Sequence, residues 1–300
     1  MLGAIIGDIA GSTFEFNNYR KKDFEIYAIG SNITDDSLMT IAVANAIIKT
    51  EKEVPCFFIG KKLNEEFYKN LEKNSREEMV KLGKNFLNIG FGPMFRKWLI
   101  SREHKPYESF GDGAAMRISP VGFVARNLEE LEKMSNIITG VSHNHPEAFK
   151  GALVTAEIIF LLKEKKINKL ELKEYIQKKY YPNLLSVDYI RKTVEFDASC
   201  QYVVPQAISC FLESKDFEDT IRTAVSSGGD SDTVADIAGS FAQALYGIPD
   251  NIKEKTFYLL DQMYLSFIKK INNDFEIFMK CVRTMQWNEV WPKGTLVVLT

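Results

Sequence analysis

Two carboxylates and two hydroxyls begin a helical pattern late in the chain, in the stretch SSGGDSDTVADIAGSFAQALYG (226–247). Gly228 and Gly229 predict a turn, and Asp230 stands where a helix cap belongs. A cap followed by an acid that favours the positive end of the helix would explain part of this pattern. Asp230, Asp232 and Thr233 together form a denser set of hard oxygen donors than capping requires, of the kind that Mg²⁺ prefers. We therefore expect a metal site here, with capping as the alternative.

A second cluster of the same kind lies nearer the N-terminus, where Thr34, Asp35 and Asp36 precede the apolar run LMTIAVANAII. Adjacent acids at one helix start can simply complement the helix dipole. Two such clusters in one helical chain instead predict two helix N-termini that converge on shared cations, because the gathered carboxylates would otherwise repel one another. The pair predicts a dinuclear site with oxygen ligands, in which metal ions are typically about 3.5–4 Å apart.

The stretch GAIIGDIAGSTFEF (3–16) carries a different signal. Gly3, Gly7 and Gly11 fall four residues apart on one face of a presumed helix, which favours the close approach of another backbone. Glu15 follows the end of that helix, between two phenylalanines. A carboxylate in a partly apolar wall can have a raised pKa and act as a base, although a lone loop acid is more often solvated.

Small residues also lead into a helical pattern in SFGDGAAMR (109–117), where backbone amides freed by the turn can cradle phosphate oxygens. A Gly-x-Gly turn alone is weak evidence of a ligand. Two of the three histidines, His143 and His145, lie just before a helix that Pro146 can begin. Both can serve as partners of backbone groups at the helix start, and a zinc site would need further His or Cys ligands.

Apolar residues that recur at intervals of three and four predict helices through most of the chain, whereas strand-like alternation is scarce. We expect an all-α protein that forms one compact domain over residues 1–300, with surface loops at 17–33 and 101–113. Only residues 295–300 have the pattern of a strand, and a lone strand makes no sheet. The clearest helical ranges are 34–50, 58–73, 114–125, 146–165, 197–213, 231–246 and 251–270.

Composition narrows the class of protein. The 38 Lys and Arg residues nearly balance 40 Asp and Glu residues, for a net charge of −2, which argues against nucleic acid as a partner. The 4 cysteines form no CxxC pair and are too few for a disulfide-stapled secreted fold. The apolar N-terminus lacks a basic region and contains Asp8, so we expect neither a signal peptide nor a membrane anchor, and a cytoplasmic location follows.

Taken together and in order, five blocks between residue 1 and about residue 250 resemble the ADP-ribosylglycohydrolase family: GAIIGDIAGSTFEF, ITDDSLMT, SFGDGAAMRISPVG, VSHNHPEAFKGA and SSGGDSDTVADIAGSFAQALYG. Each block alone would be weak evidence, and their order makes the signal specific. The resemblance implies an all-α fold of orthogonally packed helices, two Mg²⁺ or Mn²⁺ ions, and hydrolysis of the glycosidic bond at C1″ of ADP-ribose. The implied partner is an ADP-ribosylated protein or another ADP-ribose conjugate.

Matched position by position, the resemblance implies six metal ligands: Thr34, Asp35, Asp36, Asp230, Asp232 and Thr233. Glu15 matches the acid that the family uses near the distal ribose, which in some members is a water-activating base. His143 matches a histidine that contacts the ligand, and His145 is assigned a supporting role. Four further residues match positions that hold the diphosphate and distal ribose: Ser109, Phe110, Gly111 and Gly113.

The sequence departs from the family pattern in two places. The family usually has Gly-Asn-Gly before the Met-Arg pair, whereas here Asp112 puts an acceptor where a donor is often found. Some members also carry an Asp shortly upstream, ahead of a Gly, and the matching residues 88–92 here read NIGFG. We therefore expect acid–base catalysis from Glu15, with Asp112 as a second candidate.

The resemblance implies that two cations bind the 2″ and 3″ hydroxyls of the distal ribose while water, activated by Glu15 or by a metal, replaces the acceptor. Two alternatives stay open: a non-catalytic ADP-ribose-binding relative, and another metal-dependent hydrolase such as a nucleotide phosphoesterase. Loops 17–33 and 85–108 are expected to determine specificity. The nearby aromatics can either stack on adenine or belong to the core, as helical spacing favours: Phe91, Phe95, Trp98 and Tyr107.

Overall fold

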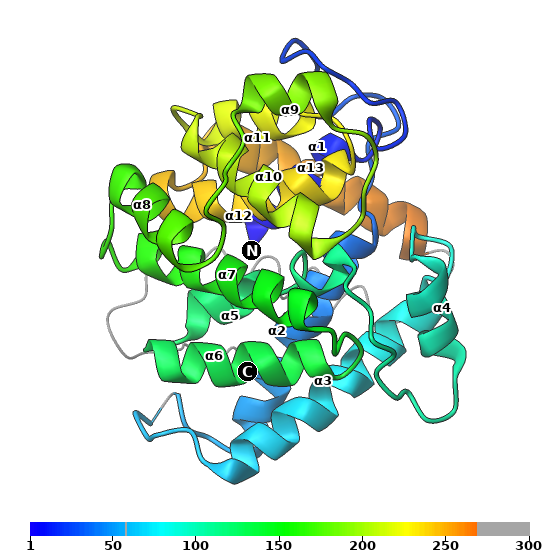
Figure 1. Ribbon diagram of the computed structural model, residues 1–300. Coiled ribbons are helices and arrows are strands. Elements are labelled where there is room, and N and C mark those ends of the chain that lie inside the picture. Colours follow the sequence, from blue (N-terminus) through cyan, green and yellow to red (C-terminus); the bar gives the residue numbers. More distant parts are fainter. Residues whose placement is uncertain (58, 269–300) are drawn as a thin grey trace.

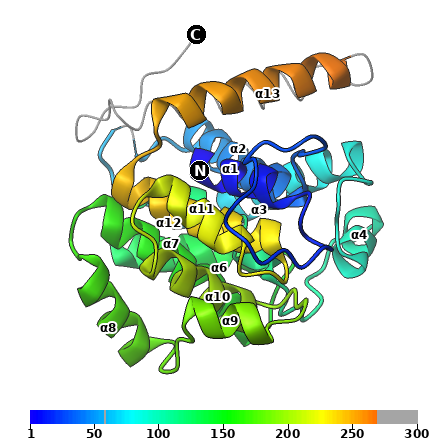
Figure 2. The ribbon, with the colours of Figure 1, turned by 90° about the horizontal axis from the view of Figure 1, so that it is seen from above.

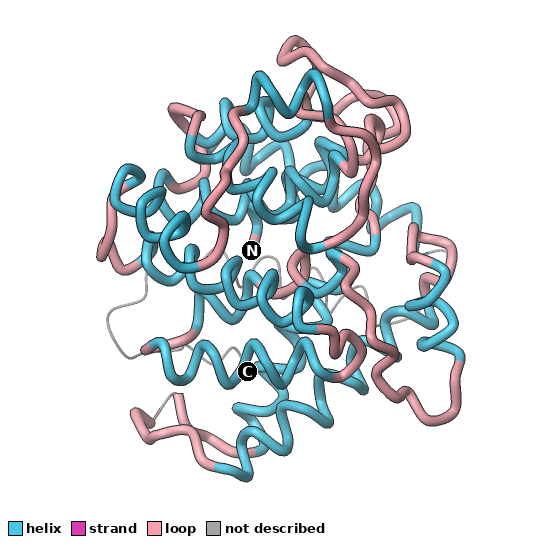
Figure 3. Tube along the Cα trace, viewed as in Figure 1, coloured by secondary structure: helices cyan, strands magenta, loops and turns pink. Residues whose placement is uncertain are grey.

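The computed structural model describes residues 1–57 and 59–268, and all regular secondary structure in this part of the chain is helical (Figures 1 and 3). The expected all-α class is confirmed there, while the strand predicted at 295–300 lies outside the described residues. None of the described helices is both long enough and apolar enough to span a bilayer. The helices are α1 (Leu2–Gly11), α2 (Asp35–Glu53), α3 (Glu65–Asn85), α4 (Pro93–Ile100), the short 3-10 helix η1 (Asp112–Ala114), α5 (Ser119–Val124), α6 (Leu128–Gly140), α7 (Pro146–Lys163), α8 (Lys169–Lys179), α9 (Val187–Thr193), α10 (Cys200–Leu212), α11 (Phe217–Val225), α12 (Ser231–Tyr246) and α13 (Asp250–Ile268).

Most predicted helices are confirmed, and two predictions were wrong at their N-terminal side. The range 58–73 becomes helical only at Glu65, because Gly60 adopts a φ of +66° and the Asn64 side chain caps α3 by accepting from Phe67 N at 2.8 Å. The range 114–125 is an α-helix only from residue 119, where Pro120 occupies the first turn of α5. The loops expected at 17–33 and 101–113 contain no α-helix.

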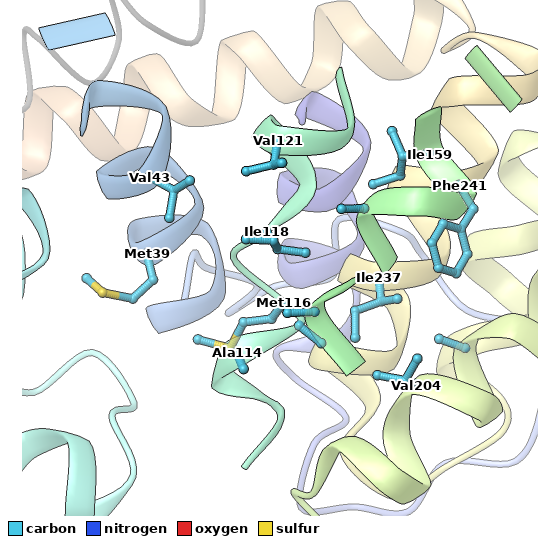
Figure 4. Close-up of a cluster of buried hydrophobic side chains, with 14 of the residues drawn as sticks. Met39, Val43, Ala114, Met116, Ile118, Val121, Ile159, Val204, Ile237 and Phe241 are labelled. Atoms are coloured by element: carbon cyan, nitrogen blue, oxygen red, sulfur yellow. The ribbon is translucent and has the colours of Figure 1, made fainter. Parts of the chain in front are cut away.

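One continuous hydrophobic core joins the helices. The segment from η1 to α5 runs through it, with side chains of α2 on one side and those of α7, α10 and α12 on the other (Figure 4). Thr40 of α2 fixes this segment further by donating to the Met116 carbonyl at 3.1 Å. The glycine turn at 109–113 is therefore anchored by buried apolar contacts. The labelled side chains are Met39, Val43, Ala114, Met116, Ile118, Val121, Ile159, Val204, Ile237 and Phe241.

Helices α1 and α12 pack backbone against backbone along the glycine face predicted for α1. A Cβ atom added at Gly7 would lie 1.9 Å from the Ala235 carbonyl oxygen, and one at Gly11 would lie 2.4 Å from Asp232 Cα. Such distances are far below van der Waals contact, so only glycine fits. This crossing brings the loop after α1 to the first turn of α12. Helix α13 runs along one edge of the molecule (Figure 2).

We predict that Gly7→Ala lowers the free energy of unfolding by at least about 2 kcal/mol, because the added methyl forces the two helices apart. Chemical denaturation followed by circular dichroism measures this. Gly140→Ala is the matched control, since a Cβ there would meet the Phe149 ring at an ordinary 3.6 Å. Equal stability of the two variants would contradict the backbone-to-backbone crossing.

Candidate functional site

Three carboxylates from distant parts of the chain lie together beside the α1–α12 crossing. Glu15, Asp230 and Asp232 each contribute one carboxylate oxygen to a set whose members all lie within 4.8 Å of one another. Glu15 belongs to the loop after α1, Asp230 is the N-cap residue of α12, and Asp232 lies in its first turn. Two of the motifs singled out in the sequence therefore meet at one site.

Long-range contacts hold the loop that carries Glu15. The Arg20 guanidinium donates to the Ser227 carbonyl oxygen, and the Asn18 side chain accepts from Gly229 N at 3.1 Å. Gly229 has a φ of +73°, a conformation that glycine adopts without strain. The turn before α12 thus receives the loop after α1, and the two segments set the position of Glu15 above the start of α12.

Capping does not explain Asp230. Its side chain makes no capping hydrogen bond to α12, and its carboxyl group lies near that of Asp112. The Asp232 carboxylate accepts from Thr233 N at 3.0 Å, and both of these residues are buried. Asp230 is therefore available to the carboxylate cluster, while Asp232 both belongs to the cluster and accepts from one amide of the first turn.

The other predicted cluster lies at the start of α2. Thr34 caps this helix by accepting from Asp36 N at 3.3 Å. Asp36 is buried, and its Oδ2 has no hydrogen-bond partner. Burial, and next the charge of nearby Asp232, raises the pKa of Asp36. Asp35 and Asp36 do not belong to the 4.8 Å set around Glu15. Gly90 lies directly against Asp35, since a Cβ there would be 2.8 Å from Asp35 Oδ1.

Asp8 is a site residue that was not predicted from the sequence. Its fully buried carboxylate accepts hydrogen bonds from both the backbone N and the hydroxyl of Thr34, at 2.9 and 2.8 Å, and from those same two groups of Ser37. Asp8 therefore ties the start of α2 to α1 and presents Asp35 and Asp36 to the site. A charged residue within an otherwise apolar, glycine-faced helix was the available signal.

Asp236 was missed as well. It lies one helical turn after Asp232 and is fully buried, and neither of its carboxylate oxygens has a hydrogen-bond partner. Burial, and next the charge of Asp8, raises the pKa of Asp236 well above its usual value. The spacing of four residues on α12 was the signal, because it places both acids on the same helix face.

Burial shifts the whole cluster toward the protonated state. Burial, and next the charge of Asp8, raises the pKa of both Glu15 and Asp35 to about 7. Burial likewise raises the pKa of Asp112 to about 7 and those of Asp230, Asp232 and Asp36 well above their usual value. None of these acids forms an ion pair with Lys or Arg in the described part of the chain.

A divalent cation fits this donor set. Uncompensated carboxylates in a buried site repel one another, and hard cations such as Mg²⁺ and Mn²⁺ relieve that repulsion through oxygen ligands. The unpartnered Oδ2 atoms of Asp36 and Asp112 are buried acceptors of the required kind. Neither the Asp230 nor the Asp36 side chain makes a capping hydrogen bond, so both carboxylates can act in this way.

The predicted diphosphate turn borders the acids. Gly111 N donates to the Ser109 hydroxyl at 3.1 Å, and the Phe110 side chain is about half exposed. Asp112, which follows Gly111, is buried with its carboxyl group near that of Asp230. The glycine turn and the carboxylate cluster are therefore parts of one site. A Cβ at Gly113 would lie 3.3 Å from His143 Nε2, so the histidine faces the turn.

The two histidines have separate structural roles. His145 caps α7, with its Nδ1 accepting from Glu147 N at 3.2 Å, which confirms the capping alternative for this residue. His143 is buried and makes no capping contact; its Nδ1 lies 2.8 Å from the Ser142 hydroxyl.

The core alternative is confirmed for the upstream aromatics. Phe91, Phe95 and Trp98 are buried, and the last two rings stack with centroids 5.1 Å apart. Tyr107 packs partly buried against His143, with ring centroids 5.5 Å apart. Phe110 is thus the exposed aromatic ring of the glycine turn.

Sequence comparison finds relatives that match most of the chain. The chain is 28% identical to an uncharacterized protein from Archaeoglobus fulgidus over 291 residues, which cover 86% of this chain and 91% of the relative. It is 22% identical to the human protein ADP-ribosylhydrolase ARH3 over 317 residues, covering 85% and 86% of the two chains. The mouse protein of the same name is 20% identical, with 83% of each chain covered.

A solved structure and a family model agree with these relatives. An ADP-ribosylglycohydrolase-related protein complex contains a chain with the same fold, with a TM-score of 0.62, 20% identity, and coverage of 84% of this chain and 89% of that one. The family model described as ADP-ribosylglycohydrolase matches residues 1–276. The chain therefore belongs to the ADP-ribosylglycohydrolase family.

Proposed function

We propose that the chain is a metal-dependent hydrolase that cleaves the glycosidic bond between ADP-ribose and a modified protein side chain or small-molecule acceptor. The observation that carries this proposal is the meeting of Glu15, Asp230 and Asp232 within 4.8 Å, beside a glycine turn. The chain matches relatives named ADP-ribosylhydrolase over most of their length, and this similarity supports the substrate class. Substrates would include ADP-ribosylated proteins.

In this proposal two Mg²⁺ or Mn²⁺ ions are held between the starts of α2 and α12 by six residues: Thr34, Asp35, Asp36, Asp230, Asp232 and Thr233. When bound, the ions supply the positive charge that neutralises the acids and polarises hydroxyl groups of the distal ribose. The buried side chains provide a fixed donor arrangement, because Asp8 holds the start of α2 and the glycine crossing holds α12.

Glu15 is the proposed general base. Its loop position and half-buried side chain let it contact both solvent and the acids of α12. A water molecule attacks C1″, Glu15 accepts a proton from that water, and the bond from C1″ to the acceptor breaks with its electron pair going to the acceptor. Asp112 is the second acid–base candidate, since it is buried beside the other acids and burial raises its pKa to about 7.

The glycine turn is proposed to hold the rest of ADP-ribose. Gly111 and Gly113 leave space where side chains would stand, and Ser109 and His143 border that space. Phe110 presents a half-exposed ring at its edge. A phosphate oxygen placed there can accept a hydrogen bond from the His143 ring, so this surface suits a diphosphate.

Product analysis by mass spectrometry tests the reaction class. The protein is incubated with Arg- and Ser-ADP-ribosylated peptides in Mg²⁺ or Mn²⁺ and, separately, in chelator. We expect intact ADP-ribose and unmodified peptide, with release lost in chelator. Release of AMP or phosphate from ADP-ribose would instead identify a phosphoesterase, and ADP-ribose binding without release from any substrate would identify a binding protein.

We predict that Glu15→Gln lowers the turnover number by about 10²–10⁴-fold, because the amide is isosteric but is not a base. Initial rates with the best peptide and calorimetric titration with ADP-ribose measure turnover and binding separately, and binding should persist. Glu25→Gln is the matched control, since Glu25 is an exposed acid of the same long loop. Full turnover in Glu15→Gln would refute its role as base.

The raised pKa values predict how metal-free protein responds to pH. In the unfolded chain the acids titrate near pH 4, whereas in the folded metal-free protein Glu15, Asp35 and Asp112 titrate near 7. Between these values the folded state binds more protons, so the free energy of unfolding falls as pH rises from about 5 to about 8. Thermal unfolding in chelator measures this fall.

Mn²⁺ should restore stability at pH 8, because the cation replaces the protons on the carboxylates. Asp232→Asn should lose most of that rescue, while Asp250→Asn, an exposed acid in the first turn of α13, should retain it. Equal rescue in both variants would place the cation elsewhere.

A further inference from the structure

Arg117 is a buried cation without an anionic partner among the described residues. It is 1% exposed and is the largest fully buried side chain among the described residues. No carboxylate within the described ranges 1–57 and 59–268 forms an ion pair with it, and its Nε has no hydrogen-bond partner. An unpaired buried guanidinium is costly, so a structural role alone explains it poorly.

The contacts of Arg117 lead to the histidine that faces the glycine turn. Its Nη2 donates to the Ser142 hydroxyl at 2.9 Å and lies 3.5 Å from His143 Nδ1. The Ser142 hydroxyl lies 2.8 Å from the same Nδ1. Arg117 also stands over the Phe95 ring at 5.8 Å, which fixes its plane beside the imidazole.

Donor and acceptor counting assigns the imidazole tautomer. Arg117 only donates, so the Ser142 oxygen that receives its hydrogen bond has its own proton available for His143 Nδ1. A proton on Nδ1 would face the guanidinium and leave the serine proton without this acceptor. Burial, and next the positive charge of Arg117, lowers the pKa of His143 well below its usual value, so the ring is neutral. The single ring proton therefore belongs on Nε2.

The Nε2 atom points at the proposed ligand surface. It lies 3.3 Å from the position of a Cβ on Gly113 and 3.8 Å from that on Gly111. The ring is held between Phe95 and Tyr107, with centroid distances of 6.1 and 5.5 Å. Its orientation is therefore fixed by packing, and its protonation pattern by Arg117.

We propose that Arg117 is a positioning residue that keeps His143 in the Nε2–H form, so that the ring donates a hydrogen bond to an oxygen of the ligand at the glycine turn. This inference rests on the proposed function for the identity of that ligand as ADP-ribose. Arg117 itself acts through His143 and Ser142.

Nitrogen chemical shifts test the assignment directly. The chain has only 3 histidines, so a long-range ¹H–¹⁵N spectrum of labelled protein at pH 7.5 resolves each ring, and loss of one ring in His143→Gln assigns it. We expect a protonated Nε2 and an unprotonated Nδ1. Arg117→Met should yield the Nδ1–H form or a mixture, and Arg117→Lys should retain the Nε2–H form. An Nδ1–H ring in the unmodified protein, or no change in Arg117→Met, would overturn the proposal.

Calorimetric titration with ADP-ribose tests the functional part and does not depend on the folding of Arg117 variants. Gln extends an amide N–H to the level of Nε2, whereas Asn reaches only the level of Nδ1. We therefore expect His143→Asn to weaken binding about tenfold or more, and His143→Gln to weaken it less. Equal losses would overturn the inference. Failure of the proposed function gives a different result, since the unmodified protein would then not bind ADP-ribose although its tautomer stayed as assigned.

Discussion

The close contact of α1 with α12 is the constraint on which the rest of the site depends. Because Gly3, Gly7 and Gly11 present no side chains, the two helix backbones meet, and the loop that follows α1 emerges at the first turn of α12. That contact puts Glu15 beside Asp230 and Asp232 across more than 200 residues of sequence. The same helix carries Asp8, whose carboxylate fixes the start of α2. One helix therefore positions the acids of two others.

The site concentrates negative charge where burial makes it costly. Without a counter-charge, the pKa values of the clustered acids rise, which means that the metal-free fold favours protons on them. A cation exchanges for those protons, so metal binding, pH and stability are coupled through the same side chains. The glycine turn next to this cluster is held by different means, through the buried segment from η1 to α5 and the histidine behind it.

The sequence predicted the features that are encoded locally. Helix periodicity and the Gly228–Gly229 turn specify the starts of α2 and α12, so their acids were identified before any fold was known. The position of Glu15 was less accessible, because Asn18 and Arg20 hold its loop against residues 200 positions away. Asp8 and Asp236 stand out as acids within apolar helices, but the sequence does not show which side chains they face, so their place in the site was missed. Likewise, only the fold separates a capping His145 from a buried His143.

Anomalous diffraction from crystals grown with Mn²⁺ tests directly whether the starts of α2 and α12 form one cation site. We expect two peaks between these helix starts, within ligand distance of Asp36 and Asp232, with Glu15 close by. No peak there at millimolar Mn²⁺, or peaks that contact neither helix start, would contradict it.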